Sequence, residues 1–298
     1  MDYEFYTVDV FTDVRFGGNQ LAVLIDAEGI SDADMQRIAA EFNYSECTFV
    51  LPPSDPENAC KVRIFTPDGE LPFAGHPNVG TAHVLAKLGR LGTPSSGMVS
   101  AHFEELSGLV DVRVAVINDL ATIEIRAPRG LDLEIAMTNA DAASLVGIET
   151  TELGEFSPRY AESGVGYVLI EVSNADVLAR LHVDAEQFAA IHTGKTKVGI
   201  YAFTRTGVGP GNDIRARMFA PLQGIAEDPA TGSAACVLAA SLANATGTDG
   251  KHQYLLEQGI EMGRPSHLSA RATVVDGKVD KIHLYGQCVD VMRGTLSL

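Results

Sequence analysis

The sequence predicts an α+β protein built from two similar lobes, in each of which a β-sheet curls around one apolar helix. The first observation is the stretch from 227 to 242, EDPATGSAACVLAASL, which continues without a charged side chain as far as Ala245. A helix that is apolar on every side is buried in a core, and this one is too short to span a bilayer. The second observation is that each half has many predicted strands and one such helix, which favours a sheet wrapped around the helix.

The third observation is an internal repeat. Residues 76–82, HPNVGTA, match residues 228–234, DPATGSA, at a proline, a glycine, a hydroxyl and an alanine, with an offset of 152 residues. Upstream, residues 63–67, RIFTP, match residues 217–221, RMFAP, with an offset of 154 residues. Two matches in the same order and at nearly the same spacing predict a duplicated unit.

The repeat also predicts where chemistry should lie. A pseudo-two-fold axis would place the two helix starts face to face, with His76 and Asp228 at equivalent positions across one cleft. A helix N-terminus presents free N–H groups and the positive end of the helix dipole, so it suits an anion. A boundary at Pro128-Arg129-Gly130 would divide the chain into an N-terminal lobe, 1–128, and a C-terminal lobe, 129–298, whose final strand could pair back with the first lobe.

The composition narrows the class of protein. At 298 residues, the chain is long enough for two domains of typical size. A net charge of −17 argues against nucleic acid and anionic membranes as partners, but leaves a small anionic substrate open. The four cysteines, at 47, 60, 236 and 288, show neither a zinc spacing nor a disulfide framework. The N-terminus lacks the features of a signal peptide, and we expect a reduced, cytoplasmic protein.

The elements of the first half follow from periodicity and turn residues. Ser31 predicts the start of a helix over residues 32–42. A strand is expected to begin at the acidic residue Glu46. Residues 67–77 are expected to form a loop, and residues 78–88 the first apolar helix. Further strands are predicted over residues 3–11, 18–25, 61–66, 110–117 and 121–127, the last two as a hairpin around Asn118-Asp119.

The elements of the second half are predicted in the same way. Thr138 and Gly147 predict the two ends of a short helix over residues 139–146. The main apolar helix follows Asp228-Pro229, a pair typical of an N-cap with proline at the first helical position. The other predicted elements are a helix over residues 184–191 and strands over 166–172, 198–204, 213–220, 272–275, 278–285 and 288–292.

Several segments together resemble the phenazine-biosynthesis PhzF-like isomerase family, which has the diaminopimelate epimerase-like fold. The resembling segments are 18–23 (GNQLAV), 43–49 (NYSECTF), 63–67 (RIFTP), 73–77 (FAGHP) with 80–82 (GTA), 227–229 (EDP) with 231–234 (TGSA), and 263–266 (GRPS). They extend over nearly the whole chain, and their combination is specific. The resemblance implies that each lobe is a barrel-like sheet around its central helix, with the site between the lobes.

The resemblance also implies a reaction. The family's activity is a cofactor-free isomerisation, and its best-known member acts on trans-2,3-dihydro-3-hydroxyanthranilate, in which a carboxylate takes a proton from one ring carbon and returns one to another. Glu46 matches that general acid/base, and His76 and Asp228 match residues that line the site. The family also suggests a homodimer and a small anionic carboxylate as substrate. The residues that match substrate-binding positions are Ser45, Gly75, Gly232 and Ser233.

The residues themselves support part of this assignment. Adding the repeat offset to Glu46 gives Val198, so the symmetry of the scaffold does not explain the acid. Histidine is a poor helix cap, and His76 is therefore expected, with Asp228, to orient a substrate hydroxyl or amino group or to relay a proton. No acid or cysteine completes a metal site around His76 and His83, so we expect no metal. The resemblance implies that the reaction needs no cofactor.

Two other classes of function remain open. Racemases and epimerases of this fold use two cysteine thiols in the paired loops, which here hold Gly75-His76 and Glu227-Asp228 instead. Cys47 should point away if Glu46 points into the site, because adjacent strand residues face opposite sides of a sheet. Cys236 lies inside the apolar helix, where a cysteine usually behaves as a small hydrophobe. The last class is a non-catalytic small-molecule binding protein on the same scaffold.

Overall fold

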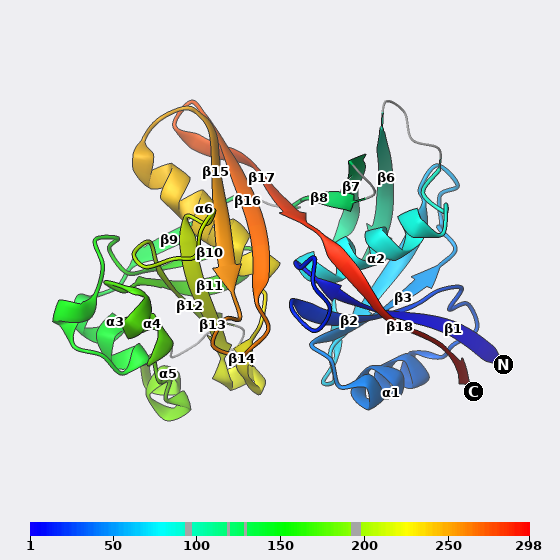
Figure 1. Cartoon of the computed structure of the whole chain (residues 1–298), viewed down its shortest axis with the longest axis horizontal. Helices are drawn as coiled ribbons and strands as arrows, with labels where there is room; N and C mark the ends of the chain where they lie inside the picture. Colours follow the sequence, from blue (N-terminus) through cyan, green and yellow to red (C-terminus); the bar gives the residue numbers. More distant parts are fainter. Residues whose placement is uncertain (93–96, 118–119, 128–129, 192–197) are drawn as a thin grey trace. The chain divides into compact units, whose positions relative to one another are not determined.

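The computed structural model describes residues 1–92, 97–117, 120–127, 130–191 and 198–298 (Figure 1). The chain divides into two compact units, one formed by Met1–Pro128 with His283–Leu298 and the other by Arg129–Ile282. The sequence-based division into 1–128 and 129–298 differs from these units in residues 283–298, which return to the first unit because the final strand pairs with the first. The expected hairpin turn at Asn118-Asp119 and the boundary residues Pro128 and Arg129 lie outside the described residues.

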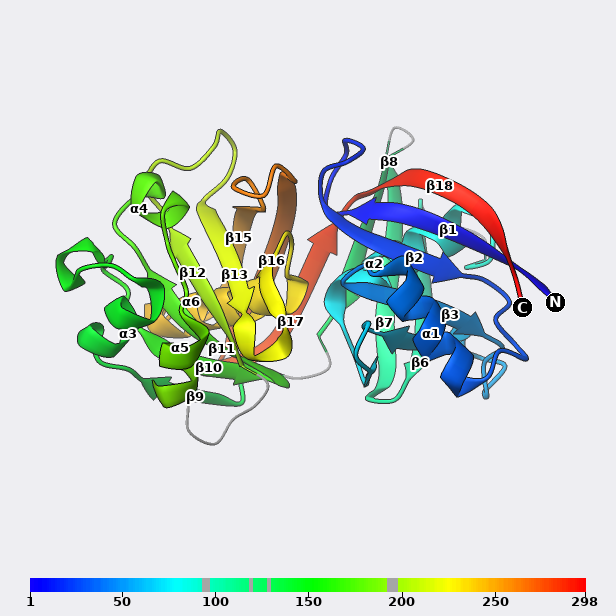
Figure 2. The ribbon, with the colours of Figure 1, turned by 90° about the horizontal axis from the view of Figure 1, so that it is seen from below.

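The first unit is a sheet whose first and last strands lie side by side, with Asp2 opposite Ser297 (Figures 1 and 2). The neighbouring pairs β2–β3 and β4–β6 are parallel, and the hairpins β3–β4, β6–β7 and β7–β8 are antiparallel. The last residues of β17, His283–Gly286, pair with β8 in this unit. The strands are β1 (Asp2–Val10), β2 (Asn19–Leu24), β3 (Glu46–Leu51), β4 (Cys60–Phe65), β5 (Glu70–Leu71), β6 (Met98–Glu105), β7 (Gly108–Ile117), β8 (Leu120–Arg126) and β18 (Cys288–Ser297).

Two helices cover opposite faces of this sheet. The central helix α2 (Gly75–Lys87) packs against β1, β2, β3, β7, β8 and β18. Helix α1 (Asp32–Phe42) begins where Ser31 accepts a hydrogen bond from the Asp34 main chain, as the sequence predicts. The alternation along β3 separates the two faces, because Phe49 lies in the apolar cluster with α1 whereas Thr48 hydrogen-bonds Thr81 of α2 at 2.9 Å.

The second unit repeats this order of pairings around its own central helix. Its parallel pairs are β11–β12 and β13–β15, and α6 (Gly232–Thr246) packs against β10, β11, β15 and β16. The strands are β9 (Leu133–Ala136), β10 (Arg159–Ser163), β11 (Val165–Glu171), β12 (Val198–Thr204), β13 (Ile214–Ala220), β14 (Ile225–Asp228), β15 (Gly250–Gln258), β16 (Ser266–Val275) and β17 (Lys278–Gly286). Each unit is therefore a sheet wrapped around one apolar helix, and the predicted fold class is confirmed.

Short helices complete the second unit. Helices α3 (Asn139–Val146), α4 (Ala175–Ala179) and α5 (Ala185–Ile191) lie together at one side of the second unit (Figure 2). Their apolar side chains join one buried cluster with β10, β11, β12 and β13. Thr138 caps the N-terminus of α3 and Gly147 its C-terminus, as the sequence predicts. The Thr138 hydroxyl accepts from the Asp141 main chain, and Gly147 has a left-handed backbone conformation. The two 3₁₀ turns are η1 (Thr150–Glu152) and η2 (Pro221–Gln223).

The starts of both central helices differ from the prediction. Asp228 still belongs to β14, where it is paired with Met218, and the N-cap of α6 is Thr231. The predicted N-cap role of Asp228 is therefore wrong. Helix α2 begins at Gly75, inside the predicted loop 67–77, so His76 lies in its first turn. That loop also contains β5, and β6, β9, β10, β14 and β15 were not predicted. The missed signal was clearest in β6, whose residues 99–104 (VSAHFE) alternate apolar and polar side chains.

The segments that repeat in the sequence make matching contacts. In the first unit, Arg63 donates from Nε and Nη2 to both carboxylate oxygens of Glu70 at 2.7 and 2.8 Å. In the second unit, Arg217 donates to both oxygens of Glu227, at 2.8 Å each. The two guanidinium groups lie 5.1 Å from the ring centre of Phe65 and 4.8 Å from that of Phe219. In both units, a bidentate ion pair thus holds a short strand just before the central helix.

We expect Gly80→Ala to lower the free energy of unfolding by about 1–3 kcal/mol, because the added methyl group overpacks the contact between α2 and the sheet. A Cβ at Gly80 would lie 2.5 Å from Leu21 Cδ2 and 2.9 Å from Val10 Cγ2. Urea denaturation measures the change. The control is Gly69→Ala, where nothing lies within 4 Å of an added Cβ. Equal stability of Gly80→Ala and wild type would contradict the tight packing inferred for α2.

Candidate functional site

In the first unit, the structure brings Glu46 and His76 into contact. Glu46 is the first residue of β3, next to Leu21 of the parallel strand β2, and His76 is the second residue of α2. His76 Nδ1 lies 3.2 Å from Glu46 Oε2. The His76 side chain is 5% exposed and that of Glu46 is 16% exposed, and the Glu46 oxygen that faces His76, Oε2, is itself buried.

The contact of the second ring nitrogen, Nε2, determines which nitrogen of His76 carries the hydrogen, and therefore which partner can donate between His76 and Glu46. Nε2 lies 3.3 Å from the main-chain carbonyl oxygen of Gln20, which can only accept, so Nε2 is the donor. Burial lowers the pKa of His76 to about 4, and the imidazole is therefore neutral at pH 7. A neutral ring that donates from Nε2 has a lone pair on Nδ1. The hydrogen bond to Glu46 is thus made when the proton is on the carboxyl group.

Cys47 lies on the other face of the sheet from this pair. It is 1% exposed and belongs to the apolar cluster that includes Met35 and Phe49. Burial raises the pKa of its thiol, so the reactive thiolate form is disfavoured. Cys236 in α6 is also buried, which raises the pKa of its thiol to about 12. Neither cysteine has the environment of a thiolate base.

Ser45 and Gly75 are the chain neighbours of the pair. Ser45 is half-buried in the bend that precedes β3, and Gly75 is the buried first residue of α2. The residue before the helix, Ala74, has no side-chain oxygen to cap it, but its carbonyl oxygen accepts from Asn78 Nδ2 at 3.0 Å. The N-cap side chain thus leaves the main-chain N–H groups of this first turn uncapped. An anion-binding site at a helix start requires such uncapped N–H groups.

In the second unit, Asp228 is the centre of a buried polar network. Its side chain is 7% exposed, and its Oδ2 accepts a 2.5 Å hydrogen bond from the Thr231 hydroxyl. Its main-chain carbonyl accepts from Gln258 Nε2 at 2.8 Å. Residues 263–266 support the same turn, because the Ser266 hydroxyl lies 3.1 Å from the carbonyl oxygen of Pro229.

Gly232 and Ser233 form the start of α6. Gly232 is its first residue, and the Ser233 hydroxyl lies 2.7 Å from the hydroxyl of Tyr167 in β11. Thr231, the N-cap residue, makes no side-chain capping bond, since its hydroxyl is used by Asp228. The first turn of α6 therefore also has main-chain N–H groups that its N-cap side chain does not satisfy.

Sequence reasoning missed several polar partners of these residues. Gln20, Tyr167, Thr231 and Gln258 each contact one of the predicted residues or its main chain. Thr231 was noted only as part of a matching segment. Gln258 was the hardest to detect, because a single glutamine at the end of a strand is usually exposed.

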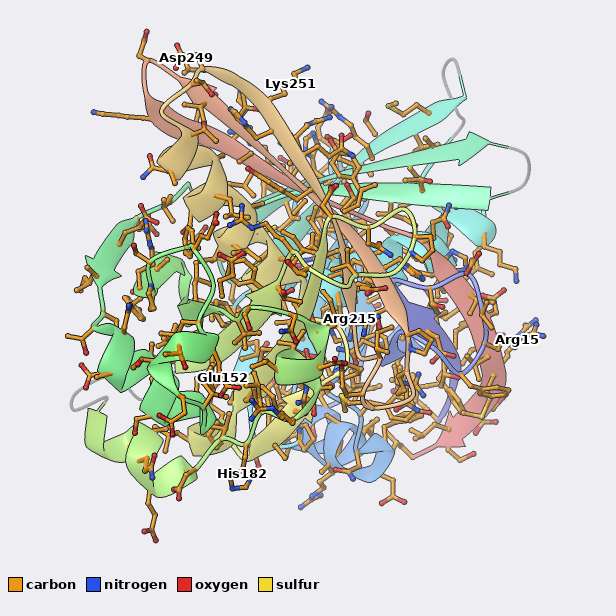
Figure 3. All side chains as sticks on the ribbon, turned by 60° about the vertical axis from the view of Figure 1, so that its left-hand side comes forward. Arg15, Glu152, His182, Arg215, Asp249 and Lys251 are labelled. Carbon is orange, nitrogen blue, oxygen red and sulfur yellow. The ribbon has the colours of Figure 1, made fainter. Side chains whose placement is uncertain are left out.

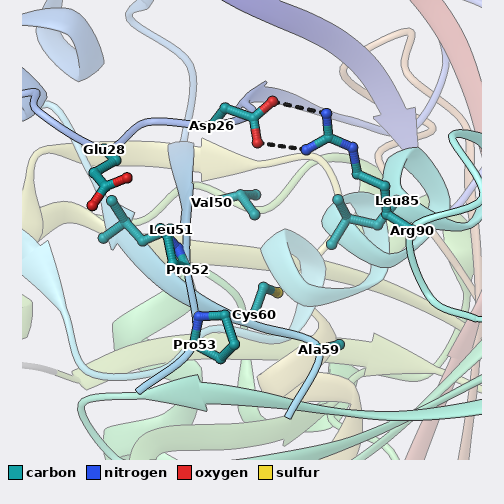
Figure 4. Close-up of a pocket in the computed structure, with 10 residues that line it drawn as sticks. All are labelled: Asp26, Glu28, Val50, Leu51, Pro52, Pro53, Ala59, Cys60, Leu85 and Arg90. Atoms are coloured by element: carbon teal, nitrogen blue, oxygen red, sulfur yellow. Dashed lines mark hydrogen bonds and ion pairs between the residues drawn. The ribbon is translucent and has the colours of Figure 1, made fainter. Parts of the chain in front are cut away.

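A separate pocket of about 320 Å³ in the first unit contains none of the predicted site residues (Figure 4). Asp26 lies at its edge and is bound by both terminal nitrogens of Arg90, at 2.6 and 2.8 Å. Cys60 lines it, and burial raises the pKa of that thiol to about 12. Glu28 also lines this pocket, so the pocket has a second carboxylate besides that of Asp26.

Two further observations limit the kinds of site. Within the described ranges, no three His, Cys, Asp or Glu side chains are grouped as metal ligands would be. The helices of the described chain are all too short or too polar to cross a lipid bilayer.

Comparison with known proteins identifies the family. The family model for phenazine biosynthesis-like proteins, PhzC-PhzF, matches residues 8–294. The chain belongs to the PhzF family. It is 39% identical to an uncharacterized isomerase of Mesorhizobium japonicum, a match that covers 97% of this chain and 96% of the relative. It is 35% identical to trans-2,3-dihydro-3-hydroxyanthranilate isomerase of Pseudomonas fluorescens, over 99% of this chain and 100% of the relative. The chain is thus an enzyme, an isomerase of the PhzF family.

Solved structures agree with this placement. The Bacillus anthracis phenazine biosynthesis protein of the PhzF family matches with a TM-score of 0.89 and 25% identity, and the match covers 100% of both chains. A probable proline racemase from Agrobacterium radiobacter has a TM-score of 0.63 at 13% identity, over 99% of this chain and 93% of the other. That second likeness concerns the fold alone, which PhzF proteins share with racemases.

We expect the stability of the protein to depend on His76 between pH 6.5 and pH 4. In the unfolded chain a histidine titrates near 6.5, whereas the pKa of folded His76 is about 4. As the pH falls through this window, the unfolded chain binds a proton that the folded chain does not. Acidification therefore costs up to about 3 kcal/mol of stability, a cost that is absent above the window.

The measurement is urea denaturation of wild type and His76→Gln at several pH values. The difference in unfolding free energy between the two should change in favour of His76→Gln as the pH falls. The exposed residue His267 provides the control variant, His267→Gln. A wild type that instead gains stability relative to His76→Gln on acidification would show that His76 is a cation paired with Glu46.

Proposed function

We propose that this isomerase moves a proton between two carbons of a small hydroxy or amino carboxylate without a cofactor, and that Glu46 is its general base and acid. The observation that supports the proposal most directly is the 3.2 Å contact between Glu46 Oε2 and Nδ1 of buried His76. The Pseudomonas fluorescens relative, named as trans-2,3-dihydro-3-hydroxyanthranilate isomerase, supports a substrate of this class.

The chemistry follows from the protonation of this pair. Glu46, as a carboxylate, removes a proton from a C–H bond next to an unsaturated group, and the electron pair of that bond moves into the conjugated system. The new carboxylic O–H donates to the lone pair of His76 Nδ1, so the neutral ring stabilises the proton-loaded form. Glu46 then returns a proton to a different carbon, which completes the isomerisation and restores the carboxylate.

The helix starts are proposed to bind the rest of the substrate. The first turn of α6, with Gly232 and Ser233, supplies main-chain N–H groups and a hydroxyl suited to a substrate carboxylate. We propose that Asp228 accepts a hydrogen bond from a substrate hydroxyl or amino group. Ser45 and Gly75 are proposed to contact the substrate beside Glu46. We further propose that the enzyme is a cytoplasmic homodimer. Its chain is proposed to have arisen by internal duplication, and the matching contacts of Arg63 and Arg217 support the duplication.

The buried thiols support this reaction over a cysteine-based racemisation. A two-thiol mechanism requires one thiolate and one thiol at the substrate carbon. Cys47 faces the apolar cluster beneath α1, and Cys236 is 5% exposed inside α6. A carboxylate base is the alternative that the chain provides, in Glu46.

We expect Glu46→Gln to abolish proton transfer and to preserve the fold, because the amide has nearly the same shape but cannot take up a proton. The measurement is NMR of trans-2,3-dihydro-3-hydroxyanthranilate in D2O with wild type and variant, following isomerisation and deuterium at the reprotonated carbon. The matched control is Glu41→Gln, on the exposed face of α1. Exchange retained in Glu46→Gln would refute the assignment of the base.

If wild type leaves that compound unchanged, a screen of small hydroxy and amino acids for Glu46-dependent C–H exchange follows. Exchange of any of them by wild type and not by Glu46→Gln would support the proposed reaction with a different substrate. The absence of Glu46-dependent exchange across the screen would contradict the proposed role.

We expect Asp228→Asn to lower kcat/KM by about tenfold or more, because a charged hydrogen-bond partner is lost. Its stability should change little, since the amide oxygen still accepts from Thr231 and Asp228 is not the helix cap. Steady-state kinetics and thermal unfolding measure the two effects. Asp176→Asn, at an exposed position in α4, is the control. Unchanged kcat/KM in Asp228→Asn would leave Asp228 with a structural role only.

A further inference from the structure

Gln258 is a buried side chain that makes three hydrogen bonds to the turn that carries Asp228 and another to Tyr201 of β12. It is the last residue of β15 and has no exposed surface. Its Nε2 lies 2.8 Å from the Asp228 carbonyl oxygen and 3.1 Å from the Thr231 hydroxyl. Its Oε1 accepts from the Thr231 main chain at 3.2 Å and from the Tyr201 hydroxyl at 3.1 Å. A glutamine so completely paired is costly to replace, because each partner would be left unsatisfied.

Two main-chain groups fix the direction of the amide. The Thr231 N–H can only donate, so the atom of Gln258 that faces it is the oxygen. The Asp228 carbonyl can only accept, so the atom that faces it is the nitrogen. Turning the amide over would place a donor against a donor and an acceptor against an acceptor.

The direction of the amide in turn sets the Thr231 hydroxyl. Thr231 Oγ1 accepts from Gln258 Nε2, and its own hydrogen is left to point at Asp228 Oδ2, 2.5 Å away. At the other end, burial raises the pKa of Tyr201 well above its usual value, so its hydroxyl stays protonated and donates to Gln258 Oε1. The hydrogen bonds therefore lead in one direction, from Tyr201 through Gln258 and Thr231 to the Asp228 carboxylate.

The neighbouring residue shows that this arrangement belongs to one face of β15. Glu257 points to the opposite side, where its carboxylate accepts from Arg215 Nε at 2.6 Å and from the Gly209 main chain at 2.8 Å. Figure 3 labels Arg215 among the side chains of the molecule. Glu257 thus fixes a loop, whereas Gln258 contacts the turn before α6. Just beyond, Gly259 packs on the same turn, since a Cβ there would lie 2.6 Å from the Pro229 carbonyl oxygen.

We propose that Gln258 is a positioning residue for Asp228, which it fixes through the Asp228 carbonyl and through the Thr231 hydroxyl. The inference rests on the proposed function, in which Asp228 binds the substrate. Gln258 orients the main chain at Asp228 and directs a donated hydrogen bond onto Oδ2. One carboxylate oxygen, Oδ2, is thus held in a fixed orientation as a hydrogen-bond acceptor.

The first test compares Gln258→Glu with Gln253→Glu, an exposed position on the same strand. An ionised glutamate at 258 has no hydrogen to donate to the Asp228 carbonyl or to Thr231. We expect Gln258→Glu to lower kcat/KM about tenfold to a hundredfold, with most of the loss in kcat if the orientation matters in the transition state. Gln253→Glu should leave it unchanged. Activity equal to wild type in Gln258→Glu would overturn the proposal.

The second test measures Asp228 directly and needs no substrate. The side-chain carboxyl carbon of Asp228 is observed by ¹³C NMR in labelled protein, and its signal is assigned by its loss in Asp228→Asn. In Thr231→Val the carboxylate loses its donor, so its titration midpoint should move to higher pH. Thr231→Ser keeps a hydroxyl and should restore the midpoint. In Gln258→Glu the midpoint should also rise.

These outcomes separate the inference from the proposed function. A midpoint that moves as expected, in a protein with no Glu46-dependent exchange, would support the positioning role and refute the proposed reaction. Midpoints that stay unchanged in Thr231→Val and Gln258→Glu, with wild-type amide spectra, would refute the positioning role and leave the reaction intact. Loss of the fold in Gln258→Glu leaves the decision to Thr231→Val and Thr231→Ser.

Discussion

The constraint on which the structure depends is the burial of one apolar helix in each curled sheet. The exposed residues of α2 and α6 lie only at their C-terminal ends, and Gly80 has no space for even a methyl group. A helix enclosed in this way reaches the surface of its sheet only at its ends. Polar residues near its start are therefore the ones that can serve chemistry, and the candidate residues His76, Gly232 and Ser233 all lie there.

The two helix starts satisfy this constraint differently. In the first unit the helix extends back to Gly75, so His76 is held inside its first turn and can hydrogen-bond the neighbouring strand β2. In the second unit the chain stays in strand conformation as far as Asp228, and a separate polar turn leads to Gly232. Because the two helices begin at different points of the repeat, His76 lies inside the first turn of α2, whereas the matching residue Asp228 lies in the strand before α6.

Desolvation is the second physical effect on the candidate site, where it favours the uncharged form of the buried side chains. A buried imidazole stays neutral, and a neutral imidazole accepts a proton-bearing carboxyl group as a hydrogen-bond partner. The same burial keeps the thiols of Cys47 and Cys236 protonated. One effect therefore favours carboxyl chemistry and disfavours thiolate chemistry, on a fold that proline racemase-like proteins also have.

The sequence alone determined the fold class, the two apolar helices, the capped ends of α1 and α3, and the acid at the start of β3, because these depend on local patterns of apolar and capping residues. It could not place the first residue of either central helix, since strand pairing at Asp228 and packing at Gly75 decide those ends. Nor could it determine the contact between Glu46 and His76, the tautomer of His76 or the partners of Asp228. Those follow from burial and from contacts such as that of Gln258, 30 residues away, which exist only in the tertiary structure.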